Sequence, residues 1–444
     1  MDVARLCHGL LLMLSCWGTA AATAVPGCKI RITAKGLELV KQEGLRFVEQ
    51  ELQNITLRDL HGKEGHFHYN ISNYDVGSIN TSAEGVNIHT VLELSKDGAG
   101  RLKISNLRCN ASIARMHAGF SGTLRKVYQF LGTFITTGMR YLLNQQICPV
   151  LNHAGLVLLN SVLDTVPVRT QMDEHIGIDY SLLRDPIVSA DALDMDFKGT
   201  FFPLEDSNET LPNRGTELHI QESERMVYLA VSEHFFDSAL FAYYQAGVLS
   251  MELAGAQVPK DVEVLLRATF FGSILMMKPS VVDAPLMLTL KVSAPPRCVI
   301  KASGTFVLVT ATLDLFLAPL EEPLIQLSSM TMESQLSAKV ALHKKALQML
   351  LDLRRFRIYS NQSALESLAL IPLQGPLKTL LQLSVVPIIN ERTKKGVQVP
   401  LPEGMDFTKE VVTNHQGYLT IGADLHFSKG LKEVIEKYRT ATRS

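Results

Sequence analysis

Residues 122–165 read GTLRKVYQFLGTFITTGMRYLLNQQICPVLNHAGLVLLNSVLDT, one long and strongly apolar stretch. Apolar side chains recur in it at spacings of three and four, which is typical of a helix with one broad hydrophobic face. A continuous helix of this length would extend about 65 Å at ~1.5 Å per residue, more than a compact domain can cover. The stretch therefore predicts an elongated molecule. Pro149 lacks a backbone donor and should bend the helix near Cys148.

The apolar face of this helix must be covered, either by a sheet or by lipid. Plain core packing and lipid contact are both open interpretations, and they are not exclusive. The side chains that we expect to contact lipid are Leu131, Phe134, Ile135 and Leu142.

Residues 1–24 have the composition of a secretory signal peptide. Arg5 lies near the start, an apolar run follows from Leu6 to Leu14, and small residues precede Val25. The chain is therefore predicted to be secreted and extracellular. No later stretch offers about 18 uncharged apolar residues, so we expect the mature chain to be soluble. N-glycosylation is predicted at six Asn-X-Ser/Thr sites, Asn54, Asn70, Asn80, Asn110, Asn208 and Asn361.

Four of the six cysteines remain after the leader, at positions 28, 109, 148 and 298. An oxidising compartment favours a disulfide bond between two of them. Four cysteines allow three complete pairings, and the sequence alone does not choose among these.

The chain shows signs of an internal repeat. A short strand leads into an amphipathic helix near Cys28 and again near Met226, and a pattern that begins at Gly177 is echoed from Gly404. Each echo follows a long apolar helix interrupted by proline, the second being Pro376–Asn390. Two copies of one helix and sheet module are the economical interpretation. The predicted organisation is a signal peptide at 1–24, an N-terminal barrel at 25–200, a polar linker at 201–224, a C-terminal barrel at 225–427 and a tail at 428–444.

Strand patterns dominate outside the helices. The segment from Leu286 to Val292 alternates, which predicts one buried face, whereas TFVLVTATLDLFL, residues 305–317, is apolar on both faces. A strand of the second kind is expected to lie between two layers. An α+β fold, with a curved antiparallel sheet wrapped around a long helix, satisfies both patterns. The tail, from Ser428, has a narrow apolar stripe, and we expect it to dock on the second barrel rather than on a lipid surface.

Catalytic motifs are missing from the sequence. It has no G-x-S-x-G, H-E-x-x-H, C-x-x-C or nucleotide-binding glycine pattern, so no enzymatic activity and no catalytic residue are predicted. His66 and His68 share a strand face, which we interpret as an exposed pair, and no metal site or cofactor is expected. The formal net charge of −1 gives no reason to expect nucleic acid as a partner.

Several long strings make the chain resemble the lipid transfer and lipopolysaccharide-binding family. They are PGCKIRITAKGLELVKQEGLRFVEQEL, LLNQQICPVLNHAG, LDLRRFRIYSNQSALESLALIPLQGPLKT and EVVTNHQGYLTIGADLHF. The resemblance implies a boomerang of two barrels joined by a central sheet, with an apolar pocket for acyl chains in each barrel. It also implies a disulfide between Cys109 and Cys148, which leaves Cys28 and Cys298 free or buried.

The chain departs from that family in one place. Only NYDVGS separates Ser72 from Ile79, where the resemblance implies a much longer stretch with further strands. A first barrel shortened between 72 and 79 should have unpaired strand edges and a pocket open to water. Reduced transfer activity is one expected consequence.

The function predicted from these features is that of a secreted lipid carrier. It would transfer phospholipids among lipoproteins and membranes, with phospholipid as cargo and no covalent chemistry. Two alternatives remain. A lipopolysaccharide-binding innate immune protein should show a basic first half, whereas acidic and basic residues are nearly balanced there. A secreted lipid hydrolase should show a nucleophile motif.

Overall fold

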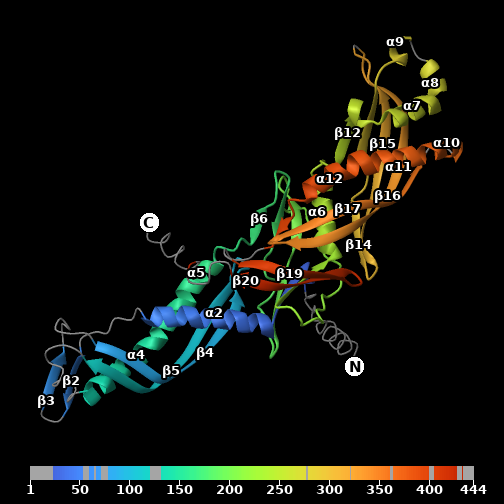
Figure 1. Ribbon diagram of the computed structural model, residues 1–444. Coiled ribbons are helices and arrows are strands. Elements are labelled where there is room, and N and C mark those ends of the chain that lie inside the picture. The colour runs from blue at the N-terminus through green and yellow to red at the C-terminus, as the bar shows by residue number, and fades with distance from the viewer. Residues whose placement is uncertain are drawn as a thin grey trace, which may run out of the picture.

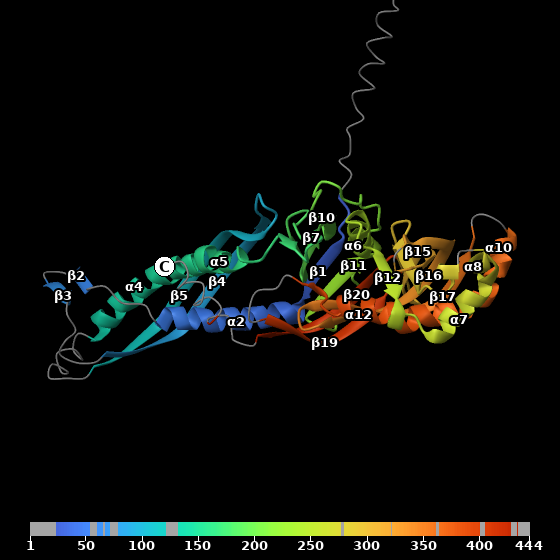
Figure 2. The ribbon, with the colours of Figure 1, turned by 90° about the horizontal axis from the view of Figure 1, so that it is seen from above.

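The fold was established from a computed structural model, which describes residues 24–53, 60–64, 67–71, 79–120, 132–276, 279–320, 322–360, 364–399, 405–427 and 433. The molecule is elongated, with one half of the chain at each end and a sheet between them (Figures 1 and 2). This confirms the elongated shape and the α+β class expected from the sequence. The predictions that lie outside the described residues are the signal peptide up to residue 23, Asn54, His66, the segment 73–78, Leu131, Asn361 and the C-terminal tail, apart from Glu433.

The central sheet contains strands from both halves of the chain. Its order is β19-β20-β11-β1-β9-β8, and all neighbours are antiparallel. The strands are β1 (Cys28–Thr33), β8 (Ile187–Val188), β9 (Ala192–Phe197), β11 (Val227–Ser232), β19 (Met405–Asn414) and β20 (Tyr418–Phe427).

Strand pairing in this sheet repeats between the two halves. The first strand of each half pairs with a strand that follows the long helix of the same half, β1 with β9 and β11 with β20. The two first strands then pair with each other, with Ile30 opposite Leu229. Each first strand also leads directly into a helix, α2 (Ala34–Gln53) or α6 (Glu233–Gln245). The internal repeat predicted from the sequence is therefore present in the fold.

The C-terminal half is built on a seven-stranded antiparallel sheet, β12-β13-β15-β16-β17-β18 with β14 also paired to β15. The strands are β12 (Ser250–Ala254), β13 (Leu286–Val292), β14 (Arg297–Lys301), β15 (Gly304–Leu317), β16 (Ile325–His343), β17 (Ala346–Tyr359) and β18 (Val397–Gln398). The helical segments are η2 (Gly255–Gln257), α7 (Lys260–Thr269), α8 (Phe271–Leu275), α9 (Pro279–Val282), α10 (Ala364–Ala369), η3 (Ile371–Leu373), α11 (Gln374–Leu380), η4 (Leu381–Val385) and α12 (Val386–Thr393).

One face of this sheet packs against the segment from α10 to α12. Leu286 and Leu288 of β13 are buried there, as the alternating pattern predicted. The expectation that β15 is covered on both faces was wrong at Leu308, which is exposed. Apolar residues on both faces of a strand therefore do not guarantee a second covering layer, because about half of a protein surface is itself apolar.

The N-terminal half consists mainly of one long hairpin beside one long helix. The hairpin is β4 (Ile79–Lys96) with β5 (Leu102–Phe120), and the helix runs through α4 (Gly132–His153), the wide turns of η1 (Ala154–Leu159) and α5 (Asn160–Leu163). The helix continues through Pro149, and the bend expected there stays a prediction. Two smaller sheets complete this half: β2 (Leu60–Glu64) with β3 (Phe67–Ile71), and β6 (Arg169–Gln171) with β7 (Ile176–Asp179) and β10 (Thr200–Pro203).

The helix Gly132–Leu163 is long and apolar enough, by length and composition only, to cross a membrane. The one broad hydrophobic face of this stretch favours an amphipathic helix rather than a membrane-spanning one. Core helices of soluble proteins pass the same test, and one side of this helix is buried against β5. Length and composition therefore do not distinguish a packed helix from a spanning one.

The segment expected to be a polar linker is anchored to the central sheet. Its first residues belong to β10, and Leu218 and Ile220 are buried against Tyr228 and Ala230. Burying a Leu or Ile side chain stabilises by about 1.5–3 kcal/mol. Hydrogen bonds add to this, since Tyr418 donates to the carbonyl of His219 and Thr420 donates to the carboxylate of Glu222, both at 2.8 Å.

A buried histidine joins β10 to α6. The Nε2 atom of His234 lies 3.0 Å from Oγ1 of Thr200. Burial, together with the nearby charge of Lys198, lowers the pKa of His234 to about 4. The histidine of the unfolded chain then binds a proton more readily than that of the native state does. The contribution of neutral His234 to the free energy of unfolding is therefore fully present above the ordinary histidine pKa of 6.5 and is lost as the pH falls towards 4.

We expect His234→Gln to make the free energy of unfolding depend less on pH below neutrality. Urea unfolding should show that the wild type loses more stability between about pH 7 and about pH 4.5 than the variant, by about 2 kcal/mol. His219→Gln, at an exposed histidine, is the control and should keep the wild-type slope. Burial raises the pKa of Asp237 to about 6, so the contribution of this carboxyl group to stability increases as the pH falls. This contribution is the same in all three proteins and does not affect the comparison. Identical slopes for wild type and His234→Gln would contradict the assignment.

Candidate functional site

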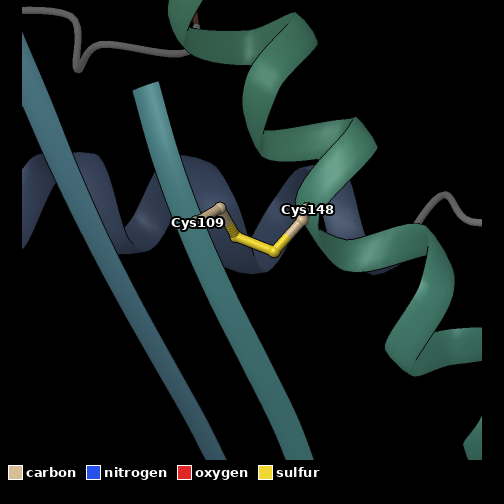
Figure 3. Close-up of a disulfide and its surroundings, with 2 residues drawn as sticks. All are labelled: Cys109 and Cys148. Atoms are coloured by element: carbon tan, nitrogen blue, oxygen red, sulfur yellow. A yellow bond between two sulfur atoms is a disulfide. The ribbon is translucent and has the colours of Figure 1, made fainter. Parts of the chain in front are cut away.

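The long N-terminal helix is fixed to the hairpin by a disulfide. Cys109 of β5 is bonded to Cys148 of α4, with 5.5 Å between the two Cα atoms (Figure 3). This confirms the pairing that the family resemblance implied. Cys28 and Cys298 are free and buried, and burial raises the pKa of the Cys28 thiol to about 12. Such a thiol is not a nucleophile at neutral pH, because the thiolate is the reactive form.

Asparagine side chains attach the same helix to the outer edge of β5. The amide of Asn160 accepts a hydrogen bond from the backbone N–H of Ile104 at 2.9 Å and donates one to its carbonyl at 3.0 Å. Further along, Oδ1 of Asn144 accepts from the N–H of Ile113 at 2.9 Å. Each amide therefore satisfies strand groups that a neighbouring strand would otherwise satisfy.

The C-terminal half repeats this arrangement. Asn390 of α12 accepts a hydrogen bond from the N–H of Leu351 on β17 at 2.8 Å and donates to its carbonyl at 2.9 Å. In each half, therefore, one asparagine near the end of the long helix binds both backbone groups of one strand residue. Spacing and composition did not identify these residues, although each asparagine follows two apolar residues, in LLN ending at Asn160 and in IIN ending at Asn390.

Gly155 allows the helix to approach β5 closely. A Cβ atom at this position would lie 2.4 Å from Cδ1 of Leu107, well inside van der Waals contact. A larger residue would therefore separate the helix from the sheet. The approach falls within the wide turns of η1, one residue before Leu156, whose carbonyl accepts a further bond from Asn160.

The predicted lipid contacts do not share one environment. Ile135 is buried on the side of α4 that faces the protein core, and Leu142 is half-buried. Phe134 is 46% exposed, and Tyr141, which the sequence analysis did not select, is 63% exposed. Helical spacing identified apolar positions but not which of them the hairpin would cover.

The hairpin also leaves apolar side chains open. Val86 and Leu92 lie on the row of β4 that is opposite the buried residues Ile113 and Leu107 of β5, yet they are 42% and 47% exposed. The reason is that α4 lies over β5 rather than over β4 (Figure 3). We call Val86, Leu92, Phe134 and Tyr141 the N-terminal apolar surface.

In the C-terminal half, side chains fill the space between helix and sheet. Leu373, Leu377 and Leu380 are fully buried against the sheet. Beside the central sheet, a cavity of about 20 Å³ is lined by Cys28, Tyr180 and other apolar residues. It has room for about one water molecule and is too small for an acyl chain. A lipid in this half would have to displace side chains.

The distal end of the C-terminal half is rich in exposed apolar side chains. Met276, after α8, is 91% exposed, and the loop between β15 and β16 adds further examples (Figure 1). We call this group the C-terminal distal surface; its members are Phe271, Met276, Leu320, Leu324, Leu368 and Ile371.

The remaining predicted sites are surface features. Asn110 and Asn208 are exposed, as glycosylation requires. The structure does not describe the side chains of Asn54, Asn70, Asn80 and Asn361. Within the described ranges, no three His, Cys, Asp or Glu side chains come together in a way that could hold a metal ion.

The fold defines a class of elongated α+β proteins. In this class, long helices lie on antiparallel sheets at the two ends of a shared central sheet, and apolar surface is left open. The chain belongs to the LBP/BPI/CETP family: the C-terminal domain of that family matches residues 170–427 and the N-terminal domain matches residues 73–166. In fold it is similar to the crystal structure of lipopolysaccharide binding protein, with a TM-score of 0.58 and 19% identity over 91% of this chain and 100% of the other.

Two relatives are much more similar in sequence. The chain is 60% identical to human phospholipid transfer protein, over 94% of this chain and 93% of the human protein. It is 55% identical to the mouse phospholipid transfer protein, over 95% and 94% of the two chains. The human alignment spans 459 positions, whereas 94% of 444 residues is about 417, so about 40 positions face no residue of this chain. A shortened chain produces such gaps, and their location between 72 and 79 stays a prediction.

Proposed function

We propose that this chain is a secreted carrier that transfers phospholipid among lipoproteins and membranes without catalysing a covalent step. The observation that carries the proposal is 60% identity, over nearly the whole chain, to a protein named for phospholipid transfer. The likeness to lipopolysaccharide binding protein concerns the fold alone, and the balanced charge of the first half does not favour an anionic glycolipid. Secretion rests on the leader at 1–24 and on the exposed glycosylation sites.

Burial of acyl chains would drive loading. Each methylene removed from water contributes about 0.8 kcal/mol, so one acyl chain can contribute on the order of 10 kcal/mol. The N-terminal apolar surface offers side chains for this contact without displacement of the core. The C-terminal distal surface offers a place for contact with a lipoprotein or membrane, because exposed apolar patches of this kind mark interaction sites. No cofactor takes part in this proposal.

The proposal is tested by the lipid that the purified chain carries and moves. Mass spectrometry of an organic extract should detect intact phospholipid, and fluorescent phosphatidylcholine should move from donor vesicles to lipoprotein particles. Fatty acid and lysophospholipid in the extract would instead indicate a hydrolase. Bound lipopolysaccharide, without phospholipid transfer, would support the immune alternative.

Tyr141→Glu should reduce both bound phospholipid and the transfer rate, by about tenfold or more, because a charge beside acyl chains must lose its hydration. The matched control is Val188→Glu, an exposed apolar residue of β8 outside the N-terminal apolar surface. Both proteins should retain the wild-type unfolding temperature. Equal lipid content and transfer in the two variants would show that Tyr141 does not contact lipid.

A further inference from the structure

The outer edge of β4 is unpaired in the part of the chain that the structure describes. Within those residues β4 pairs only with β5. The peptide groups of Ile104 and Ile113, which lie opposite Leu94 and Val86, point away from β4, because they bind Asn160 and Asn144. In an antiparallel pair of strands, the residue opposite such a residue also directs its backbone N–H and C=O groups outwards, away from the partner strand. The N–H and C=O groups of alternate residues from Val86 to Leu94 therefore face away from the hairpin.

Among the described residues, no hydrogen bond attaches a helix to this edge as Asn144 and Asn160 attach the long helix to the other. Figure 3 shows β5 between β4 and α4, whereas α2 passes behind both strands. At the end of the strand, the N–H of Lys96 donates to Asp185 at 2.8 Å, which ends the free edge there. Long edges with unpaired backbone groups are templates for pairing with another strand.

The edge is complementary to a second copy of itself. If two β4 strands run antiparallel with Thr90 opposite Thr90, then Ile88 faces Leu92 and Val86 faces Leu94. In this register alternate residues from Val86 to Leu94 have outward-pointing backbone groups, so the register also aligns the hydrogen bonds. The pairing ends before Lys96, whose N–H donates to Asp185 and whose ammonium group donates to the carbonyl of Leu183 at 2.9 Å.

We propose that two copies of this chain pair through their β4 edges and form a four-stranded sheet in the order β5-β4-β4-β5. The two-fold axis passes through Thr90, perpendicular to the sheet. Because an edge-to-edge pair keeps equivalent faces on the same side, both α4 helices lie on one face of the new sheet. The exposed Val86 and Leu92 of each copy then lie opposite Leu94 and Ile88 of the other copy, which gives them apolar neighbours that one chain alone lacks.

The first experiment measures the mass of the full-length chain by light scattering over a micromolar concentration series. The wild type should be a dimer. Thr90→Lys places two ammonium groups together at the axis and should raise the dimer dissociation constant by at least about tenfold. Val411→Lys, at an exposed position on the edge strand β19 of the central sheet, should leave the dimer unchanged. A monomeric wild type, or equal effects of the two lysines, would overturn the proposal.

The second experiment tests the register by introducing charges. Val86→Lys alone should weaken the dimer, because an ammonium group would then face the apolar Leu94 at both ends of the pair. Combining Val86→Lys with Leu94→Glu should restore at least part of the lost affinity, because opposite charges would then face each other. Circular dichroism and the unfolding temperature establish that each variant is folded. No weakening by the single change, or no recovery in the combined variant, would exclude pairing centred on Thr90.

Discussion

Cys148→Ala should lower the free energy of unfolding by about 2–5 kcal/mol and sharply reduce secretion of the chain. The bond closes a loop of 39 residues that contains the end of β5 and the start of α4. Without it, the unfolded chain gains conformational freedom, while the native helix keeps only its packing and hydrogen bonds to one hairpin. Secretion into culture medium and urea unfolding of the purified protein give the two measurements.

The control for this experiment is Cys298→Ala, which removes a free and buried cysteine. Because this change breaks no cross-link, it should cost less than the loss of the bridge. Cys109→Ala should reproduce the effect of Cys148→Ala, and the double variant should be no worse than either one. Normal secretion and stability of Cys148→Ala would contradict a structural role for the bond.

Asn160→Ala should destabilise the N-terminal half by about 2–4 kcal/mol, because it leaves the N–H and C=O of Ile104 buried without partners. Asn390→Ala should have an effect of similar size on the C-terminal half, through Leu351. Hydrogen exchange read by mass spectrometry should show which half opens. In each variant, protection should fall in the strand that lost its asparagine, β5 or β17, and hold in the other.

Asn106→Ala is the matched control for both variants. The side chain of Asn106 makes one exposed hydrogen bond of 3.3 Å to Glu93, and its loss should change stability by no more than about 0.5 kcal/mol. If Asn160→Ala proved as mild as this control, water would be replacing the amide at the strand edge. The asparagines would then not hold the helices in place.

Patterns with a short range were predictable from the sequence. Helical spacing identified the long helix that ends at Leu163, and alternation identified the buried row of β13. The repeat was visible because two similar segments must fold into two similar modules, and the pairing of β1 with β9 and β11 with β20 agrees with it. The disulfide came from family resemblance, since cysteine spacing alone left three pairings open.

The functional surfaces were less predictable, because exposure depends on what packs against each residue. Ile135 and Phe134 are neighbours in the chain, but one is buried and the other is open. The roles of Asn160 and Asn390 were hidden because each amide binds a strand 56 or 39 residues away in the chain. Such contacts exist only after the helix lies on the strand.

The sequence by itself determined the class of fold, the two modules, the long helix and, with its family resemblance, the bridge that fixes this helix. These features follow from spacing and composition, which act between residues close together in the chain. The shortened segment predicted unpaired strand edges, but only the tertiary structure decided that α4 covers β5, that the open edge within the described residues is that of β4, and which apolar side chains stay exposed. The physical reason is that burial and edge pairing belong to surfaces made by distant segments, and a hairpin of two strands is too narrow to enclose a helix.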